Sequence, residues 1–215
     1  MDTQEIIKIE NASKSFKSQA VLTSVNVTVL SGQSFGFVGQ NGSGKTVLLK
    51  LICGLMYPEQ GRVIVGGKQL GKDVDFPENV GAIIEAPGFI SYQSGLKNLL
   101  YLASLRNKIR KEDVIEAMRT VGLNPNDKKH VGKYSLGMKQ RLGIAQAIME
   151  NPSILVLDEP MNGLDKSGVK DVRTLLLKLK GEGVTIILAS HIQEDIDILC
   201  DTVYEVDEGN LIFIR

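Results

Sequence analysis

The chain has 215 residues, which is enough for one large domain or for a domain with a subdomain. Hydrophobic residues make up 43% of the sequence, so it can build a core, and intrinsic disorder is excluded as the default. Its 25 basic and 25 acidic residues give a formal net charge of +0, which argues against a nucleic-acid-binding protein and gives no support to electrostatic membrane attachment.

Two features of the sequence concern the cellular compartment. Cys53 and Cys200 show neither a C-x-x-C motif nor metal-ligand spacing, so we expect no disulfide framework and a reducing, cytosolic compartment. The N-terminus, MDTQEIIKIE, is acidic and mixed and does not resemble a signal peptide. No apolar run approaches the roughly 20 residues that span a bilayer, so any membrane-spanning part would come from another chain.

The beginning of the chain predicts antiparallel strands. Residues 6–10 and 21–30 alternate apolar and polar side chains, so each segment would bury one face. Phe16 lies between them and precedes a glycine-rich loop. Its ring could stack on a nucleobase or pack as an ordinary core or edge aromatic, and the spacing alone leaves both interpretations open.

A glycine-rich loop then joins an apolar strand, residues 34–38, to an apolar helix, residues 47–53. The loop reads Gly39-Gln40-Asn41-Gly42-Ser43-Gly44-Lys45-Thr46. It fits the phosphate-binding pattern G-x-x-x-x-G-K-[ST], with a strand before it and a helix after it. Its glycines let backbone amides surround a phosphate, Lys45 can reach the β- and γ-phosphates, and Thr46 offers a hydroxyl to Mg²⁺. We therefore predict that this loop binds a nucleoside triphosphate with Mg²⁺.

The rest of the chain alternates strands and helices. Strands are predicted over residues 62–65 and 80–84, whereas apolar side chains recur at helical spacing over about 95–150. Strands are also predicted over residues 153–159 and 184–189, whose apolar runs ILVL and VTIIL are typical of parallel strands covered on both faces. Helices are predicted over 167–180 and 193–199, and the last strands near 202–206 and 211–214. This order indicates the α/β class with a helical insertion.

Two adjacent carboxylates, Asp158 and Glu159, end the apolar strand ILVLD. Ligand sites in open α/β sheets lie at the carboxyl ends of the strands, so Asp158 should lie near Thr46 and the metal. Asp158 could hold Mg²⁺ through water while Glu159 polarises the attacking water. A solvated turn would be favoured for this pair alone, but the intact phosphate loop favours the catalytic interpretation.

Several motifs occur together in this chain: the phosphate loop, YSLGMKQR over residues 134–141, ILVLDEP followed by Gly163-Leu164-Asp165, and His191. Together they resemble the nucleotide-binding subunit of ATP-binding-cassette (ABC) transporters over essentially the whole chain. The resemblance implies an α/β fold with a P-loop NTPase core, whose mostly parallel sheet is flanked by helices, an N-terminal antiparallel β subdomain and an inserted α-helical subdomain. It also implies a single ATP-binding domain over 1–215, with its core in 1–87 and 152–215 and the helical subdomain at about 88–151.

The resemblance further implies roles for individual residues. Residues 134–138 match the family's Leu-Ser-Gly-Gly-Gln signature, which acts across a head-to-tail dimer on ATP held by the other subunit. Ser135 and Gly137 are retained, whereas Leu136 replaces a glycine and Met138 replaces the glutamine. Glu159 matches the catalytic base, Asp158 the magnesium-linked aspartate, Asp165 the loop that crosses the dimer interface, His191 the switch histidine that contacts the γ-phosphate, and Phe16 the aromatic that stacks on adenine.

The clearest departure from the family is Glu85, because a glutamine usually follows the strand at 80–84 and contacts Mg²⁺. A carboxylate at this position can coordinate Mg²⁺, but it adds a negative charge near the phosphates. The pattern Ile-Glu-x-Pro-Gly-Phe over residues 84–89 resembles the branch that exports, or gives resistance to, peptide antibiotics such as lantibiotics and bacitracin.

The sequence thus predicts an ATP-hydrolysing subunit, with ATP and Mg²⁺ as ligands, that powers export of or resistance to a peptide antibiotic or similar amphipathic compound. The expected partners are a second ATP-binding subunit, in a homodimer or heterodimer, and a separate transmembrane permease that holds the chain at the cytoplasmic face of the membrane. No nucleic-acid partner is expected.

Two alternatives remain open at this point. The chain could be the ATP-binding regulatory half of a heterodimer, with little hydrolysis of its own, although the intact Glu159 and His191 argue against this. It could also be a soluble member of the superfamily that works in DNA maintenance or on the ribosome. The sequence has no long coiled-coil insertion, no second cassette and no basic surplus, all of which disfavour that second alternative.

Overall fold

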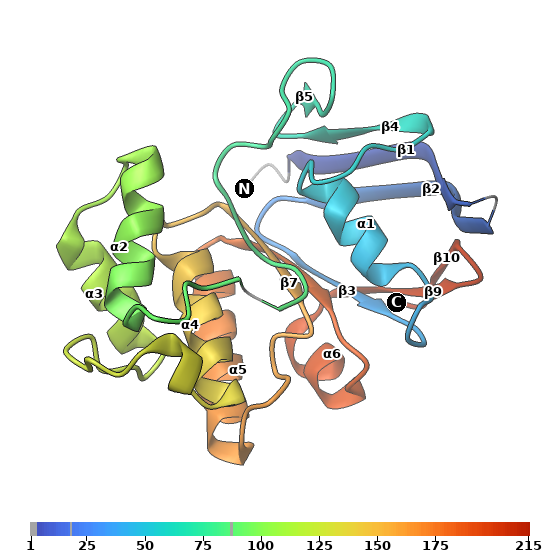
Figure 1. The fold of residues 1–215 in the computed structure, drawn as a ribbon. Coiled ribbons are helices and arrows are strands. Elements are labelled where there is room, and N and C mark those ends of the chain that lie inside the picture. The colour runs from blue at the N-terminus through green and yellow to red at the C-terminus, as the bar shows by residue number, and fades with distance from the viewer. Residues whose placement is uncertain (1–3, 18, 87) are drawn as a thin grey trace.

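The computed structural model describes residues 4–17, 19–86 and 88–215. Two β-sheets lie side by side, and a group of helices projects to one side of them (Figure 1). Pro87, which belongs to the pattern at residues 84–89, lies outside the described residues. The predicted α/β class with an N-terminal antiparallel sheet, a mostly parallel sheet and a helical insert is confirmed.

The N-terminal sheet is antiparallel and has the strand order β2-β1-β4-β5. Its strands are β1 (Glu5–Phe16), β2 (Gln19–Leu30), β4 (Gln60–Val65) and β5 (Lys68–Gln69). The prediction for β1 was too short, because polar residues follow residue 10 in the sequence. Pairing with β2 on one side, broken by several register shifts, keeps the chain extended as far as Phe16.

The second sheet has the order β10-β9-β3-β8-β7-β6. Its strands are β3 (Ser34–Val38), β6 (Val80–Ile83), β7 (Ile154–Asp158), β8 (Thr185–Ala189), β9 (Thr202–Asp207) and β10 (Asn210–Phe213). Neighbouring strands from β9 to β6 are parallel, and only the edge strand β10 is antiparallel to its neighbour. The continuous apolar runs of β7 and β8 are buried along their whole length, as expected for parallel strands covered on both faces.

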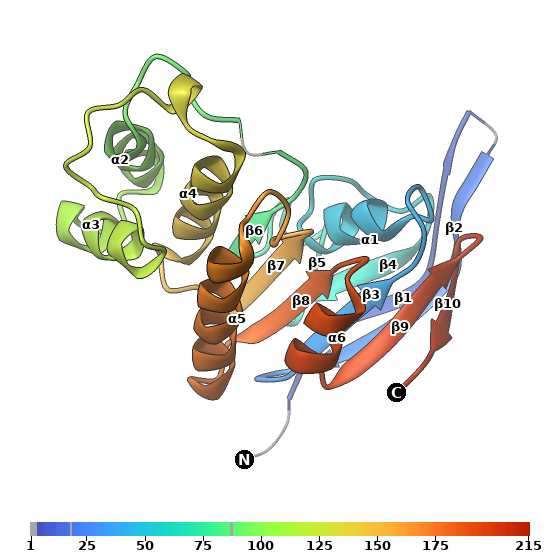
Figure 2. The ribbon, with the colours of Figure 1, turned by 90° about the horizontal axis from the view of Figure 1, so that it is seen from below.

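The helices cover the two faces of this sheet unequally. The helices are α1 (Lys45–Ile52), α2 (Gly95–Arg106), α3 (Lys111–Thr120), α4 (Leu136–Ile148), α5 (Lys166–Gly181) and α6 (Gln193–Leu199), with a short 3-10 turn at Val131–Lys133. Figure 2 shows α1 between the two sheets, α5 and α6 on the opposite face of the second sheet, and α2, α3 and α4 together at its β6 edge. Among the described residues, no helix is both long and apolar enough to cross a membrane.

The parallel strands contribute side chains to two hydrophobic cores, one on each face of the sheet. Alternate side chains of β7, such as Leu155 and Leu157, pack with the helices α2 to α6, whereas Ile154 and Val156 pack with α1 and the N-terminal sheet. Successive side chains of a strand point to opposite faces, so a continuous apolar run is required wherever both faces are covered. This packing leaves the carboxyl ends of the strands as the place where polar side chains gather.

Candidate nucleotide-binding site

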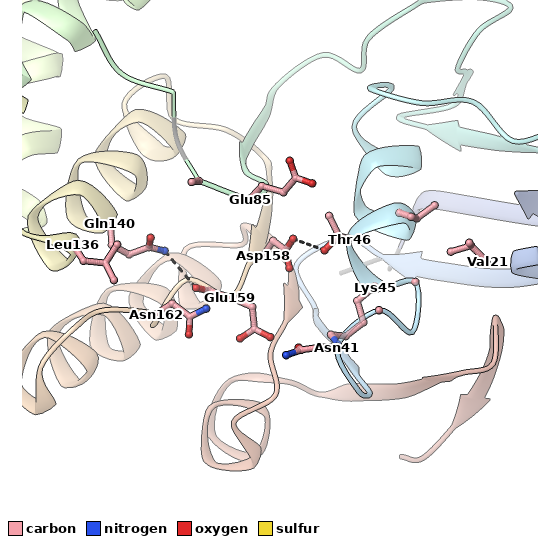
Figure 3. Close-up of a pocket in the computed structure, with 14 residues that line it drawn as sticks. Val21, Asn41, Lys45, Thr46, Glu85, Leu136, Gln140, Asp158, Glu159 and Asn162 are labelled. Atoms are coloured by element: carbon pink, nitrogen blue, oxygen red, sulfur yellow. Dashed lines mark hydrogen bonds between the residues drawn. The ribbon is translucent and has the colours of Figure 1, made fainter. Parts of the chain in front are cut away.

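Predicted site residues follow four parallel strands and lie at one edge of the second sheet. The phosphate loop follows β3, Glu85 follows β6, Glu159 follows β7 and His191 follows β8. A cleft of about 490 Å³ opens at this edge, and its lining includes the phosphate loop and the carboxylates Glu85, Asp158 and Glu159 (Figure 3). Its size is in the range of small-molecule sites.

The phosphate loop is shaped for an anion. Gly42 has a left-handed φ of 84°, and a Cβ added to it would meet nothing within 4 Å, so its backbone faces open space. The helix α1 begins after Gly44 with neither a side-chain cap nor an acidic residue in its first turn. The amides at its N-terminus are therefore available to a phosphate, and the helix dipole favours negative charge there.

Two further groups of the loop fit a bound phosphate. The Lys45 ammonium lies back over the loop, where it donates hydrogen bonds to the carbonyl oxygens of Gly39 at 2.7 Å and Gln40 at 2.9 Å. Within the described residues, the buried Oγ of Ser43 has no hydrogen-bond partner. A buried hydroxyl without a partner is costly, and a phosphate oxygen at this place would satisfy it. The residues present therefore fit the phosphate group of a nucleotide.

The metal-site prediction concerned Thr46, Asp158 and Glu85. The Thr46 hydroxyl donates to Oδ2 of Asp158 at 2.7 Å, although the two residues are far apart in sequence. Such paired hard oxygen atoms suit Mg²⁺, which takes few protein ligands and keeps waters and phosphate oxygens in the remaining positions. Glu85 lies at the same mouth, but its carboxylate is paired with Lys50, one helical turn beyond Thr46, and Figure 3 shows it above the Thr46–Asp158 pair.

Glu159 is held in a specific orientation directly after β7. Its backbone has a left-handed φ of 49°, and its amide donates to the Ala189 carbonyl at the end of β8 at 2.9 Å. Its carboxylate lies 2.8 Å from Nδ1 of His191, within hydrogen-bonding distance. A non-glycine residue in this conformation costs of order 1 kcal/mol, so the surrounding contacts must maintain it. They place the Glu159 side chain in the cleft beside the phosphate loop.

Sequence reasoning did not single out Gln140 as a site residue. Its side-chain amide, buried on α4, donates to the Pro160 carbonyl at 3.0 Å and approaches the Glu159 carbonyl at 3.4 Å. It therefore ties α4 to the turn that carries Glu159. Gln140 belongs to the YSLGMKQR segment, but only the fold reveals that its side chain reaches back across the sheet edge.

Several predicted site residues do not line the cleft, among them Phe16, Ser135, Gly137, Asp165 and His191. Ser135 caps α4 by accepting from the Met138 amide at 3.2 Å, and Asp165 caps α5 by accepting from the Gly168 amide at 2.8 Å. Gly137 lies in the first turn of α4. Phe16 ends β1 with its ring partly exposed and with the Lys14 ammonium 5.8 Å from the ring centroid. Phe16, Ser135, Gly137 and Asp165 are absent from the lining of the cleft that contains the phosphate loop.

Comparison with known proteins gives a consistent result. The family model described as "ABC transporter" matches residues 22–162. The bacitracin transport ATP-binding protein BcrA of Enterococcus faecalis is 40% identical over 99% of this chain and 70% of its own length. The lantibiotic transport ATP-binding protein SrtF of Streptococcus pyogenes is 34% identical over 96% of this chain and 89% of its own length.

A solved structure establishes the likeness of the fold. The ATP-binding cassette MJ0796, in a dimeric post-hydrolysis state bound to ADP and Pi, superposes with a TM-score of 0.88 over 98% of each chain. The two sequences are 21% identical, so the superposition speaks for the fold alone. The two sheets and the inserted helices of the present chain are those of an ATP-binding cassette.

Proposed function

Because this chain belongs to the ABC transporter family as one of its ATP-binding subunits, and is an ABC ATPase, we propose that it hydrolyses Mg²⁺-bound ATP to drive a separate transmembrane permease. The observation that carries the proposal is the 2.7 Å contact between the hydroxyl of Thr46 and the carboxylate of Asp158, beside Glu159. It joins the phosphate loop to the strand end that bears the carboxylates.

The phosphate loop would hold the triphosphate. In the proposal, the amides of residues 39–46 and the hydroxyl of Ser43 bind phosphate oxygens, and Lys45 leaves the loop carbonyls to reach the β- and γ-phosphates. Thr46 and Asp158 would hold the magnesium ion, which neutralises charge on the phosphates when bound. Phe16, partly exposed at the end of β1, would stack on the adenine.

Glu159 is the proposed general base. Its carboxylate would orient the attacking water and accept its proton, while the phosphate loop stabilises the charge on the transferred group. Nδ1 of His191 lies 2.8 Å from Glu159, and in the proposal the other ring nitrogen, carrying a proton, would donate to the γ-phosphate. The protein's part is positioning and charge stabilisation, with little covalent chemistry.

The position of three predicted nucleotide-binding residues outside the cleft supports a second ATP-binding subunit. Ser135, Gly137 and Asp165 do not line the cleft of their own chain, and Ser135 and Asp165 stand at the N-termini of α4 and α5. We propose that they complete the site of a partner cassette, either an identical copy or a relative. Within each subunit, we propose a core over 1–87 and 152–215 and a helical subdomain at about 88–151.

The transported compound is proposed from the relatives. BcrA is named for bacitracin transport and SrtF for lantibiotic transport. We propose that this subunit serves export of, or resistance to, a compound of that kind. It would work at the cytoplasmic face of the membrane, attached through the permease that supplies the membrane-spanning helices.

ATP turnover of the purified chain, measured beside Glu159→Gln, tests the proposal. We expect the variant to hydrolyse ATP about 10²- to 10⁴-fold more slowly, the usual contribution of a general base. It should still bind ATP, and size-exclusion chromatography should show a dimer only when ATP is present. Undiminished turnover in Glu159→Gln would refute the assignment of the base.

The same experiment distinguishes a subunit that hydrolyses ATP by itself from the regulatory subunit of a heterodimer. A chain that binds ATP tightly but neither turns it over nor dimerises would refute independent hydrolysis by a homodimer. Copurification with the permease and a second cassette would then show whether it works in a heterodimer. An intact pair of Glu159 and His191, joined at 2.8 Å, favours the hydrolytic role.

A further inference from the structure

An ion pair joins the phosphate-loop helix to Glu85. Nζ of Lys50 lies 2.6 Å from Oε1 of Glu85, and the side chains are 25% and 63% exposed, respectively. Lys50 follows Thr46 by one helical turn on α1, so the two side chains share a face of that helix. The ammonium of Lys50 therefore reaches Glu85 from the same helix that supplies the predicted magnesium ligand.

The three carboxylates of the cleft have different partners. Asp158 accepts a hydrogen bond from Thr46, and the carboxylate of Glu159 lies within hydrogen-bonding distance of His191. Glu85 is paired with Lys50, and its backbone has a left-handed φ of 59°, two residues after the end of β6. Figure 3 shows the Glu85 side chain extended toward α1, with its carboxylate above the Thr46–Asp158 pair.

The direction of Glu85 matters because the cleft is proposed to receive a highly charged anion. A free carboxylate at its mouth would repel a triphosphate, and the interaction between two such charges is felt over several ångströms in partly desolvated sites. Pairing with an ammonium at 2.6 Å both cancels this charge and fixes the long Glu85 side chain in one orientation.

We propose that Lys50 is a positioning residue, which holds the Glu85 carboxylate one helical turn away from the predicted magnesium ligand Thr46 and compensates its charge. The inference rests on the proposed function, because it takes the cleft to be the nucleotide site. Without Lys50, the Glu85 carboxylate is free to turn toward the phosphates, where it repels metal-free nucleotide and attracts Mg²⁺. Lys50 thus sets how strongly nucleotide binding depends on the metal.

A double-mutant cycle on nucleotide binding tests this role. Binding of a fluorescent ATP analogue is measured in EDTA and with Mg²⁺ for the parent, Lys50→Met, Glu85→Gln and the double variant. In EDTA, we expect Lys50→Met to weaken binding up to about fivefold more when Glu85 is present than when a glutamine replaces it, the range reached by exposed ion pairs. The stimulation of binding by Mg²⁺ should rise in Lys50→Met, and Lys50→Arg should restore the parental behaviour.

Lys180→Met is the matched control. Lys180 is also 25% exposed and lies 2.6 Å from Asp201, but this pair is at the end of α5, outside the cleft. Its loss should leave nucleotide binding and its Mg²⁺ dependence unchanged. Equal effects of Lys50→Met in the parent chain and in the Glu85→Gln variant would overturn the inference while leaving the proposed function standing. Failure of the parent chain to bind the analogue at all would overturn the proposed function as well.

Discussion

The loop that carries His191 is anchored by a buried ion pair. Removing one partner of this pair should lower the free energy of unfolding of the protein. Asp195 on α6 is fully buried and lies 2.6 Å from the guanidinium of Arg173 on α5. Its second oxygen lies 3.4 Å from the hydroxyl of Ser190, which in turn accepts the amide hydrogen of Ile192. The residues on either side of His191 are therefore fixed through Asp195.

The expected cost of Asp195→Ala follows from the burial of this pair. Removing one partner of a buried pair costs about 3–5 kcal/mol, because the other charge is left uncompensated. Arg173 keeps some exposure, and Glu194 remains as a second partner at 3.0 Å. We therefore expect a smaller cost, about 2–3 kcal/mol, which for a chain of this size lowers the melting temperature by about 5–10 °C.

Urea titration followed by circular dichroism measures this loss, and Asp197→Ala is the control on the same helix. Asp197 pairs with Arg215 at 2.8 Å, but both side chains are nearly half exposed. Its removal should change the unfolding free energy far less than the removal of Asp195, because exposed ion pairs contribute little. A cost for Asp195→Ala no larger than that for Asp197→Ala would refute the idea that the buried pair anchors the His191 loop.

Two further predictions concern titratable side chains. Burial raises the pKa of both Cys53 and Cys200 to about 12. Because the thiolate is the reactive form, alkylation by iodoacetamide at pH 8, followed by mass spectrometry, should be about 10³-fold slower in the native chain than in urea. Fast labelling of either thiol without denaturant would contradict this burial. The amide of Gly168 and the hydroxyl of Ser167 lower the pKa of Asp165, so its contribution to stability is present above the unfolded value of about 3.9 and is lost as the pH falls through the folded value. Asp165→Asn should therefore show a shallower loss of stability between about pH 5 and pH 3 in urea titrations, and an unchanged slope would refute the assignment.

The strand and helix pattern could be predicted because each segment has a strong local signal. Alternating side chains mark β2, continuous apolar runs mark β7 and β8, and the glycine-rich loop lies between β3 and α1. The full length of β1 could not be predicted, because its polar second half is held extended by pairing with β2. Strand formation there depends on a neighbouring strand and not on the local pattern.

In the candidate site, too, some residues could be predicted from the sequence and others could not. The sequence places Thr46 and Asp158 together, because the strands that precede them are expected to be parallel and to end at one edge, and the structure brings their side chains within 2.7 Å. Lys50 and Gln140 carry no such signal, since a lysine or glutamine on a helix is ordinarily a solvated residue. Their roles depend on which loop lies opposite, and this is determined by the packing of α1 and α4 against the sheet.

The two departures from the family signature have separate structural reasons. Leu136 is exposed at the mouth of the cleft and packs against Gly163, where an added Cβ would collide with the Leu136 side chain. Met138 packs against the helical core, while its backbone amide is bound by the hydroxyl of Ser135. Both replacements thus change side chains but leave the first turn of α4 intact. In the proposed dimer, Ser135 and backbone amides at this helix end would recognise a phosphate of the partner's nucleotide, and the altered signature retains these groups.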